Sequence, residues 1–211
     1  MTPTPEPESR QEKKDRTRRA ILDAALDLLA ESSFAALSLR QLTKAVGIVP
    51  TAFYRHFATL DELGLALVDE SFVSLRSMLS EVRRGDPRPE QLIDASVDVL
   101  AAHLAEDVPH FRFISRERYG GAGAVSGAIR HELDLFEREL ARDLGRMPEL
   151  GAWGARDLAL LAGLFVNLMV AAAGEFVSAD DPRARARITE TVRHQARMAV
   201  VGAAGWSPLP D

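Results

Sequence analysis

The sequence predicts an all-α protein of about nine helices. From residue 12 onward, apolar residues recur three or four positions apart, which is the period of an amphipathic helix. No segment shows the strict alternation of apolar and polar residues that a half-buried strand requires. Clusters of Gly, Pro and Asp separate the periodic segments, and such clusters end helices. With 211 residues, the chain is long enough for one large domain or two small ones.

The positions of these Gly, Pro and Asp clusters predict how the chain is organised. Residues 1–12 are expected to be a disordered tail, because three prolines alternate there with Glu, Thr and Ser. We predict one domain over residues 13–59, a second over residues 60–205 and a short tail over residues 206–211. The individual helices are expected at about 13–32, 39–46, 51–57, 60–84, 89–105, 109–118, 124–145, 155–177 and 182–202.

Capping residues mark the short N-terminal helices. Ser38 is a suitable N-cap for the second helix, and Gly47 ends it because glycine tolerates the left-handed backbone. Pro50 opens the third helix at a position where its missing N–H costs nothing. Thr59 and Glu62 have the spacing of a capping box and predict the start of the long fourth helix.

The charges are divided unevenly along the chain. Residues 10–57 hold nine Lys and Arg against five Asp and Glu, a net charge of +4. Residues 58–211 hold 17 against 24, a net charge of −7. Because salt screens charges over about 10 Å, a basic head on an acidic body can still bind phosphates. Chance asymmetry remains an alternative explanation.

Several function classes lack the residues they need. The chain has no cysteine, which excludes disulfides, thiolate metal sites and cysteine nucleophiles. The five histidines offer no zinc-protease spacing, and neither a Gly-rich phosphate loop nor a nucleophile elbow is present. We therefore expect no enzymatic activity, no metal and no cofactor. The N-terminus lacks the apolar core of a secretory signal, so a cytoplasmic location is expected.

The first three helices have the geometry of a helix-turn-helix. In that unit the third helix enters the major groove of DNA and the second crosses the phosphate backbone. The second and third helices and the turn between them offer apolar residues that can face inward, namely Leu39, Leu42, Val46, Ile48, Phe53 and Phe57. The residues left to face DNA are Thr51, Ala52, Tyr54, Arg55 and His56. Two alternatives stay open: Tyr54 packs into the core, or Arg55 is a solvated surface charge.

Residues 16–70 resemble the DNA-binding domain of the TetR family of transcription regulators along their whole length. The most specific part is FYRHF (53–57) followed by DEL (61–63). The resemblance implies that DNA is contacted by Arg40 and by the outward residues of the third helix, namely Thr51, Ala52, Tyr54, Arg55 and His56. It also implies that Lys44 contacts the phosphate backbone. Leu60 stands where the family usually has a lysine, so one phosphate contact is missing. Three arginines near the start of the first helix, Arg16, Arg18 and Arg19, are candidates to make a phosphate contact in its place.

The resemblance also implies a homodimer that binds a palindromic operator. In TetR-type proteins the last two long helices pair with their copies in a second subunit. The interface residues expected on these helices are Leu161, Phe165, Val166, Ala172, Val192, Ala196 and Val200. The uncharged stretch over residues 158–174 rises about 25 Å, less than the roughly 30 Å core of a bilayer, so no membrane partner is expected.

A hydrophobic effector is expected in the second domain, as in other regulators of this kind. The candidate pocket residues are Phe72, Phe111, Phe113, Arg116, Phe136, Phe165, Asn167 and Met169, although any one aromatic residue is more often plain core. VPTAFYRHF (49–57), DELGLALVDE (61–70), FRFISRERYGGAGAV (111–125) and IRHELDLFERELARDL (129–144) are similar to the TetR-family subgroup that represses unsaturated fatty-acid synthesis. That similarity implies a long-chain acyl-CoA effector and control of lipid or fatty-acid genes.

Two alternatives keep the DNA-binding class. The first is a repressor of an efflux or catabolic operon that responds to a drug-like or small aromatic molecule. The second is an architectural protein, which would bind random and palindromic DNA equally well.

Overall fold

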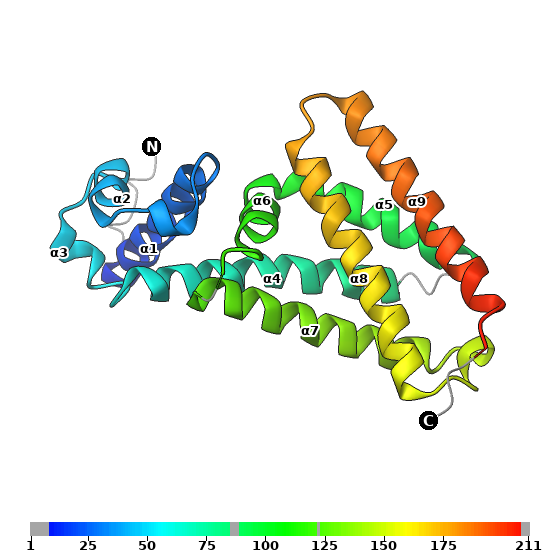
Figure 1. Cartoon of the computed structure of the whole chain (residues 1–211). Coiled ribbons are helices and arrows are strands. Elements are labelled where there is room, and N and C mark those ends of the chain that lie inside the picture. Colours follow the sequence, from blue (N-terminus) through cyan, green and yellow to red (C-terminus); the bar gives the residue numbers. More distant parts are fainter. Residues whose placement is uncertain (1–8, 85–88, 122, 208–211) are drawn as a thin grey trace, which may run out of the picture. The chain divides into compact units, whose positions relative to one another are not determined.

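The computed structural model describes residues 9–84, 89–121 and 123–207. These residues form nine α-helices and two short 3-10 helices and contain no strand, which confirms the predicted fold class (Figure 1). The chain divides into two compact units, Met1–Leu67 and Val68–Asp211, which we call the N-terminal and C-terminal units. The division falls within helix α4 (Leu60–Arg84), whereas the sequence analysis placed it just before this helix.

The N-terminal unit contains α1 (Arg10–Leu29), α2 (Leu39–Val46), α3 (Pro50–Phe53) and the first two turns of α4, with a 3-10 helix at Phe34–Ala36. Helix α1 packs against α2, and α2 packs against α3. The core of the unit is formed by side chains with almost no exposed surface, namely Ile21, Ala25, Leu42, Phe53, Phe57, Leu63 and Leu67. Helices α1, α2 and α3, the segment that follows α3 and the start of α4 therefore share one apolar centre.

Helix α1 starts earlier than expected, at Arg10 rather than at residue 13. A capping box explains the difference: Ser9 Oγ accepts the N–H of Glu12 at 3.1 Å, and Glu12 Oε2 accepts the N–H of Ser9 at 2.7 Å. The prediction of a disordered tail is wrong for residues 10–12, which are helical. Residues 1–8 lie outside the described part of the chain.

The predicted caps of the short helices are confirmed. The Ser38 side chain accepts the N–H of Gln41, and Gly47 ends α2 with a left-handed φ of 74°. Pro50 stands in the first turn of α3. Thr59 Oγ1 accepts the N–H of Glu62 at 3.0 Å at the start of α4. The recognition segment (residues 50–57) is helical only over α3 and continues as a turn, so it is less regular than predicted.

The C-terminal unit is built around α8 (Ala155–Ser178). This helix packs against α5 (Pro89–Glu106), α6 (Val108–Glu117), α7 (Ala124–Leu144) and α9 (Pro182–Ala204). The remainder of α4 lies along α7 (Figure 1), where the Phe72 and Phe136 rings stack with centroids 5.7 Å apart. Figure 1 also shows α8 and α9 side by side. The predicted break at residues 85–87 lies outside the described part of the chain.

The C-terminal end of the chain also differs from the sequence prediction, which placed a tail over residues 206–211. Trp206 turns back toward the start of α8, where its Nε1 donates to Oδ1 of the buried Asp157 at 3.3 Å. Of the expected tail, Trp206 is thus held in place, and residues 208–211 lie outside the described part.

Helix α8 is long and apolar enough to cross a membrane by length and composition. One such helix is weak evidence for a membrane span, because core helices of soluble proteins have the same properties. Only 28% of its most apolar 18-residue stretch is buried within the protomer. A large part of this helix therefore presents uncovered surface.

Candidate nucleic-acid interface and effector pocket

Most of the predicted DNA-contacting side chains are exposed on the N-terminal unit. Phe53 and Phe57 point into the core and are 1% exposed, so the positions between them point outward. The exposed members are Arg16, Arg40, Lys44, Thr51, Tyr54 and Arg55, whereas Ala52, His56 and Arg18 are partly buried. The helix-turn-helix therefore presents hydroxyl and cationic groups on the side opposite its core.

The structure decides between the two readings of Tyr54. Its side chain is 57% exposed and meets the Phe53 ring only edge-on, with centroids 5.6 Å apart and an interplanar angle of 82°. The core alternative for Tyr54 is thus excluded, and its hydroxyl is available to an external acceptor or donor.

Arg18, one of the partly buried members of the predicted set, makes two contacts within the protein. Its Nη1 donates to the backbone oxygen of His56 at 3.3 Å, and its Cζ lies 4.3 Å from the centroid of the Phe57 ring. It shares a face of α1 with the buried Ile21 and Leu22. The side chain thus spans from α1 to the end of the recognition segment.

His56 is held in the neutral form at neutral pH. Burial lowers the pKa of its imidazole below the usual value of 6.5, and the positive charges of Lys14, Arg18 and Arg55 lower it further. Its Nδ1 atom is buried and has no hydrogen-bond partner among the described residues.

The predicted pocket residues do not gather around one cavity. Phe72, Phe111 and Phe113 are buried among apolar neighbours, and Phe136 stacks on Phe72. The two polar candidates, Arg116 and Asn167, are exposed, while Phe165 and Met169 are partly buried. The Asn167 Oδ1 atom accepts a hydrogen bond from Arg118 at 3.1 Å, which links α6 to α8.

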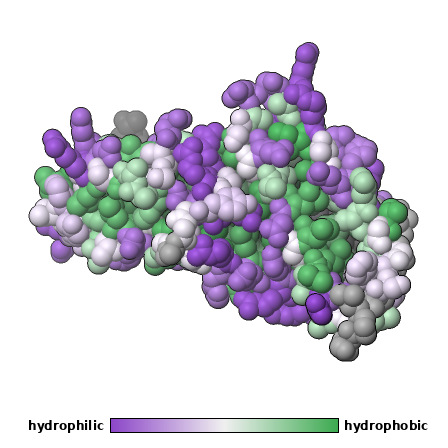
Figure 2. All heavy atoms as spheres, in the orientation of Figure 1, coloured by the Kyte–Doolittle hydropathy of each residue, from purple (hydrophilic) through white to green (hydrophobic). Residues whose placement is uncertain are grey.

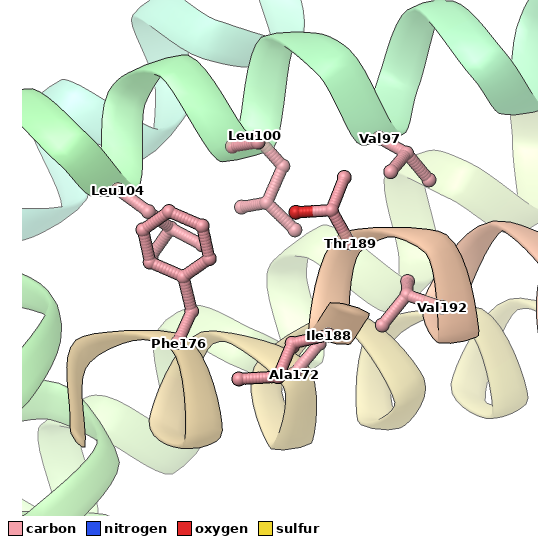
Figure 3. Close-up of a pocket in the computed structure, with 9 residues that line it drawn as sticks. Val97, Leu100, Leu104, Ala172, Phe176, Ile188, Thr189 and Val192 are labelled. Atoms are coloured by element: carbon pink, nitrogen blue, oxygen red, sulfur yellow. The ribbon is translucent and has the colours of Figure 1, made fainter. Parts of the chain in front are cut away.

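A small apolar pocket lies instead between α5, α8 and α9. Figure 3 shows Leu100, Phe176 and Val192 from these three helices pointing toward one another. The pocket has a volume of about 10 Å³, enough for about one water molecule. None of the eight predicted pocket residues lines it. The full lining is Val97, Leu100, Ala101, Leu104, Ala172, Phe176, Ile188, Thr189 and Val192.

A wider and more open groove, of about 480 Å³, runs between α7 and the start of α8. Its floor is alanine and its rim is charged, with both signs present; the lining residues are Asp134, Glu137, Arg138, Ala141, Arg142, Ala155 and Ala159. Such a groove lacks the apolar enclosure typical of a site for a hydrophobic effector. The described residues also contain no cluster of three or more His, Asp or Glu able to hold a metal ion.

The expected dimer-interface residues separate into two groups. Ala172, Val192 and Ala196 are buried within the protomer, at 6%, 4% and 0% exposure, so contrary to expectation they offer no surface to a partner. For Ala172 and Val192 the reason is that they pack α8 and α9 together against Val97 of α5. Leu161, Phe165 and Val166 are partly buried, and Val200 is exposed.

The apolar residues that do face outward are on other positions of the same helices. Leu160 and Leu164 on α8 and Met198 and Val201 on α9 are each more than half exposed. We call these four residues the α8–α9 stripe. Figure 2 shows apolar atoms gathered along α8, with hydrophilic atoms over α7 beside them. Sequence reasoning missed the stripe because α8 is apolar on every side, and periodicity then gives no direction.

Comparison with known proteins agrees with this architecture. Residues 21–67 match the family model for bacterial regulatory proteins, tetR family. A TetR-like transcriptional regulator from Rhodococcus sp. RHA1 is 16% identical, with a TM-score of 0.71 over 88% of this chain and 96% of that one. FadR from Bacillus subtilis, solved with stearoyl-CoA, is 14% identical, with a TM-score of 0.67 over 84% and 96%.

A third similar structure is AibR in complex with isovaleryl coenzyme A and operator DNA. It is 16% identical, with a TM-score of 0.66 over 85% of this chain and 97% of that one. At such identities these likenesses show the shared fold. Residues 21–67 thus match the model of the tetR family of bacterial regulatory proteins, and the described residues share the all-helical fold of the TetR-like transcriptional regulator from Rhodococcus sp. RHA1.

Proposed function

We propose that this protein is a homodimeric, cytoplasmic transcription repressor that binds a palindromic DNA operator and is regulated by an acyl-CoA. The observation that carries the DNA-binding part is the outward face of the helix-turn-helix. There Thr51, Tyr54 and Arg55 are exposed on a segment anchored from behind by Phe53 and Phe57. Hydroxyl and guanidinium groups read base edges and bind phosphates, and an anchored segment presents them in a fixed register.

The dimer is proposed to form through the α8–α9 stripe. Four large apolar side chains more than half exposed on two adjacent helices resemble the uncovered half of a four-helix bundle. A two-fold axis between two such protomers would present two recognition segments. A palindromic operator has the matching symmetry.

The effector is proposed to be a CoA thioester whose acyl chain enters the C-terminal unit. Support comes from two proteins of the same fold, whose structures are complexes with isovaleryl coenzyme A and stearoyl-CoA. Ligand sites for molecules of drug size occupy about 300–1,000 Å³. The pocket of about 10 Å³ between α5, α8 and α9 is far smaller, so binding would require these helices to move apart. The regulated genes are proposed to serve lipid or fatty-acid metabolism.

The DNA-binding proposal can be tested by selecting bound duplexes from a random-sequence pool with the purified protein. A palindromic consensus is expected, and Thr51→Ala or Arg55→Ala should weaken binding to it by about 5- to 160-fold, because a good base-edge or phosphate contact contributes about 1–3 kcal/mol. Arg146→Ala is the matched control, since this exposed arginine lies in the C-terminal unit, beside Asp143. Equal binding of random and selected duplexes would refute a sequence-specific repressor.

The effector proposal needs a separate experiment. Operator affinity would be measured with stearoyl-CoA, isovaleryl-CoA and free CoA, and native mass spectrometry would identify any co-purified molecule. An acyl-CoA that couples to DNA binding should change operator affinity about 5- to 150-fold, whereas free CoA should not. Unchanged affinity with every acyl chain would disprove acyl-CoA regulation and leave the repressor proposal intact.

A further inference from the structure

Arg18 makes two contacts that end at the same short stretch of chain. Its guanidinium carbon lies 4.3 Å from the centroid of the Phe57 ring, within the range of a cation–π contact. One of its terminal nitrogens donates to the backbone oxygen of His56 at 3.3 Å. Both partners lie at the end of the recognition segment, whereas Arg18 itself belongs to the middle of α1.

The environment of these contacts strengthens both of them. Phe57 is 1% exposed and packs against Phe53 with ring centroids 5.7 Å apart, so Arg18 covers the outer side of an aromatic pair in the core. The His56 carbonyl belongs to the turn that follows α3, where backbone oxygens have no helical partner and favour a cationic donor.

We propose that Arg18 is a positioning residue: it holds the recognition segment against α1, and it is not a phosphate contact. This proposal rests on the proposed DNA-binding function only for its consequence, because the contacts themselves lie within the protein. Without the two Arg18 contacts, the end of the segment would be held less firmly against α1, and Thr51 to Arg55 would lose their fixed orientation.

The planar shape of the guanidinium group is essential to this role. Its flat face can lie on the Phe57 ring while an edge N–H reaches the His56 oxygen. A lysine ammonium has the same charge but no flat face, so it cannot make both contacts in one position. Arg18→Lys therefore separates positioning from charge. A phosphate contact would survive this substitution, whereas the combined contacts of Arg18 with Phe57 and His56 would be lost.

The first test is hydrogen exchange on the full-length protein without DNA. Arg18→Lys and Arg18→Ala should both speed exchange of the backbone amides in residues 50–57 by about two- to thirty-fold, the range expected for losing a cation–π contact. Arg10→Ala, which changes an exposed arginine at the start of the same helix, should leave exchange there unchanged. Wild-type exchange in both Arg18 variants would overturn the proposal.

The second test is the salt dependence of binding to the duplex selected with wild-type protein. Arg18→Lys should bind several-fold more weakly, with the same slope of log K against log salt as the wild type. A phosphate contact predicts the opposite: Arg18→Lys would bind normally, and Arg18→Ala would reduce the slope by about 0.9. If the wild type selects no duplex, the proposed function fails, while the exchange experiment still decides the role of Arg18.

Discussion

Ser71 Oγ and His110 Nδ1 lie 2.9 Å apart and join α4 to α6 within the C-terminal unit. Ser71 is 1% exposed and is followed by Phe72, which has no exposed surface. A hydrogen bond to a buried hydroxyl has a preferred distance and direction, and it is stronger in apolar surroundings than in water. The pair thus fixes how α4 packs against α6, and α4 continues without a break into the N-terminal unit.

Ser71→Ala and His110→Ala should each destabilise the protein by about 1–2 kcal/mol, because each leaves the other partner less well satisfied. The double variant should cost less than the sum of the two, with a coupling free energy of about 0.5–1.5 kcal/mol. Urea unfolding of the wild type, the two single variants and the double variant measures these free energies. Strictly additive effects would show that the two side chains do not interact.

Gly47→Ala should destabilise the protein by about 1–2 kcal/mol, because its φ of 74° is unfavourable for a residue with a Cβ atom. A Cβ at this position would meet nothing within 4 Å, so the cost arises from the backbone and not from a clash. Gly47→Asn is the control and should cost less, since asparagine tolerates the left-handed region. A neutral Gly47→Ala variant, measured by urea unfolding, would contradict this account.

His56 should make stability depend on pH. Its pKa is lowered in the folded protein, so below pH 6.5 the unfolded chain takes up a proton that the folded protein resists. Stability conferred by neutral His56 is thus present above pH 6.5 and is lost as the pH falls toward the lowered pKa. The urea midpoint of His56→Gln should fall less than that of the wild type between pH 7.5 and 5.5.

The exposed His194 on α9 provides the comparison. His194→Gln should leave the pH dependence of the N-terminal unit unchanged, because the substitution is made in the other unit. If His56→Gln and the wild type lose stability in parallel, neutral His56 does not contribute to folding.

Leu164→Glu and Met198→Glu should convert the proposed dimer to a monomer, because each places a charge within the α8–α9 stripe. Sedimentation velocity at micromolar concentration measures the change. Val73→Glu is a matched control on α4, where the valine is 60% exposed outside the stripe, and it should remain dimeric. Dimers in all three variants would place the interface elsewhere.

The fold could be predicted closely because the helix ends carry their own chemical signals. Ser38, Gly47 and Pro50 fix the short helices through local hydrogen bonds and allowed backbone angles, which depend on neighbours in sequence. The start of α1 was misplaced because its first turns are polar on all sides. Only the capping pair Ser9 and Glu12 marks that start, and an apolar period cannot reveal it.

The candidate sites were harder to predict because they depend on packing between helices. Phe53 and Phe57 determine by spacing alone that Thr51 and Tyr54 face outward, so the exposure of the proposed DNA-binding face could be predicted from the sequence. By contrast, α8 is apolar all round, and nothing in its sequence shows that Ala172 faces α5 and α9 while Leu164 faces outward. The role of Arg18 depended on Phe57, which is distant in sequence.

The size of the pocket between α5, α8 and α9 also has a kinetic consequence. A space that holds one water molecule cannot form an encounter complex with an acyl chain, so a ligand destined for it must wait until the helices separate. The observed association rate should then rise with ligand concentration only up to a ceiling, and that ceiling should be the same for short and long chains. The length of the acyl chain would instead change the residence time of the bound ligand.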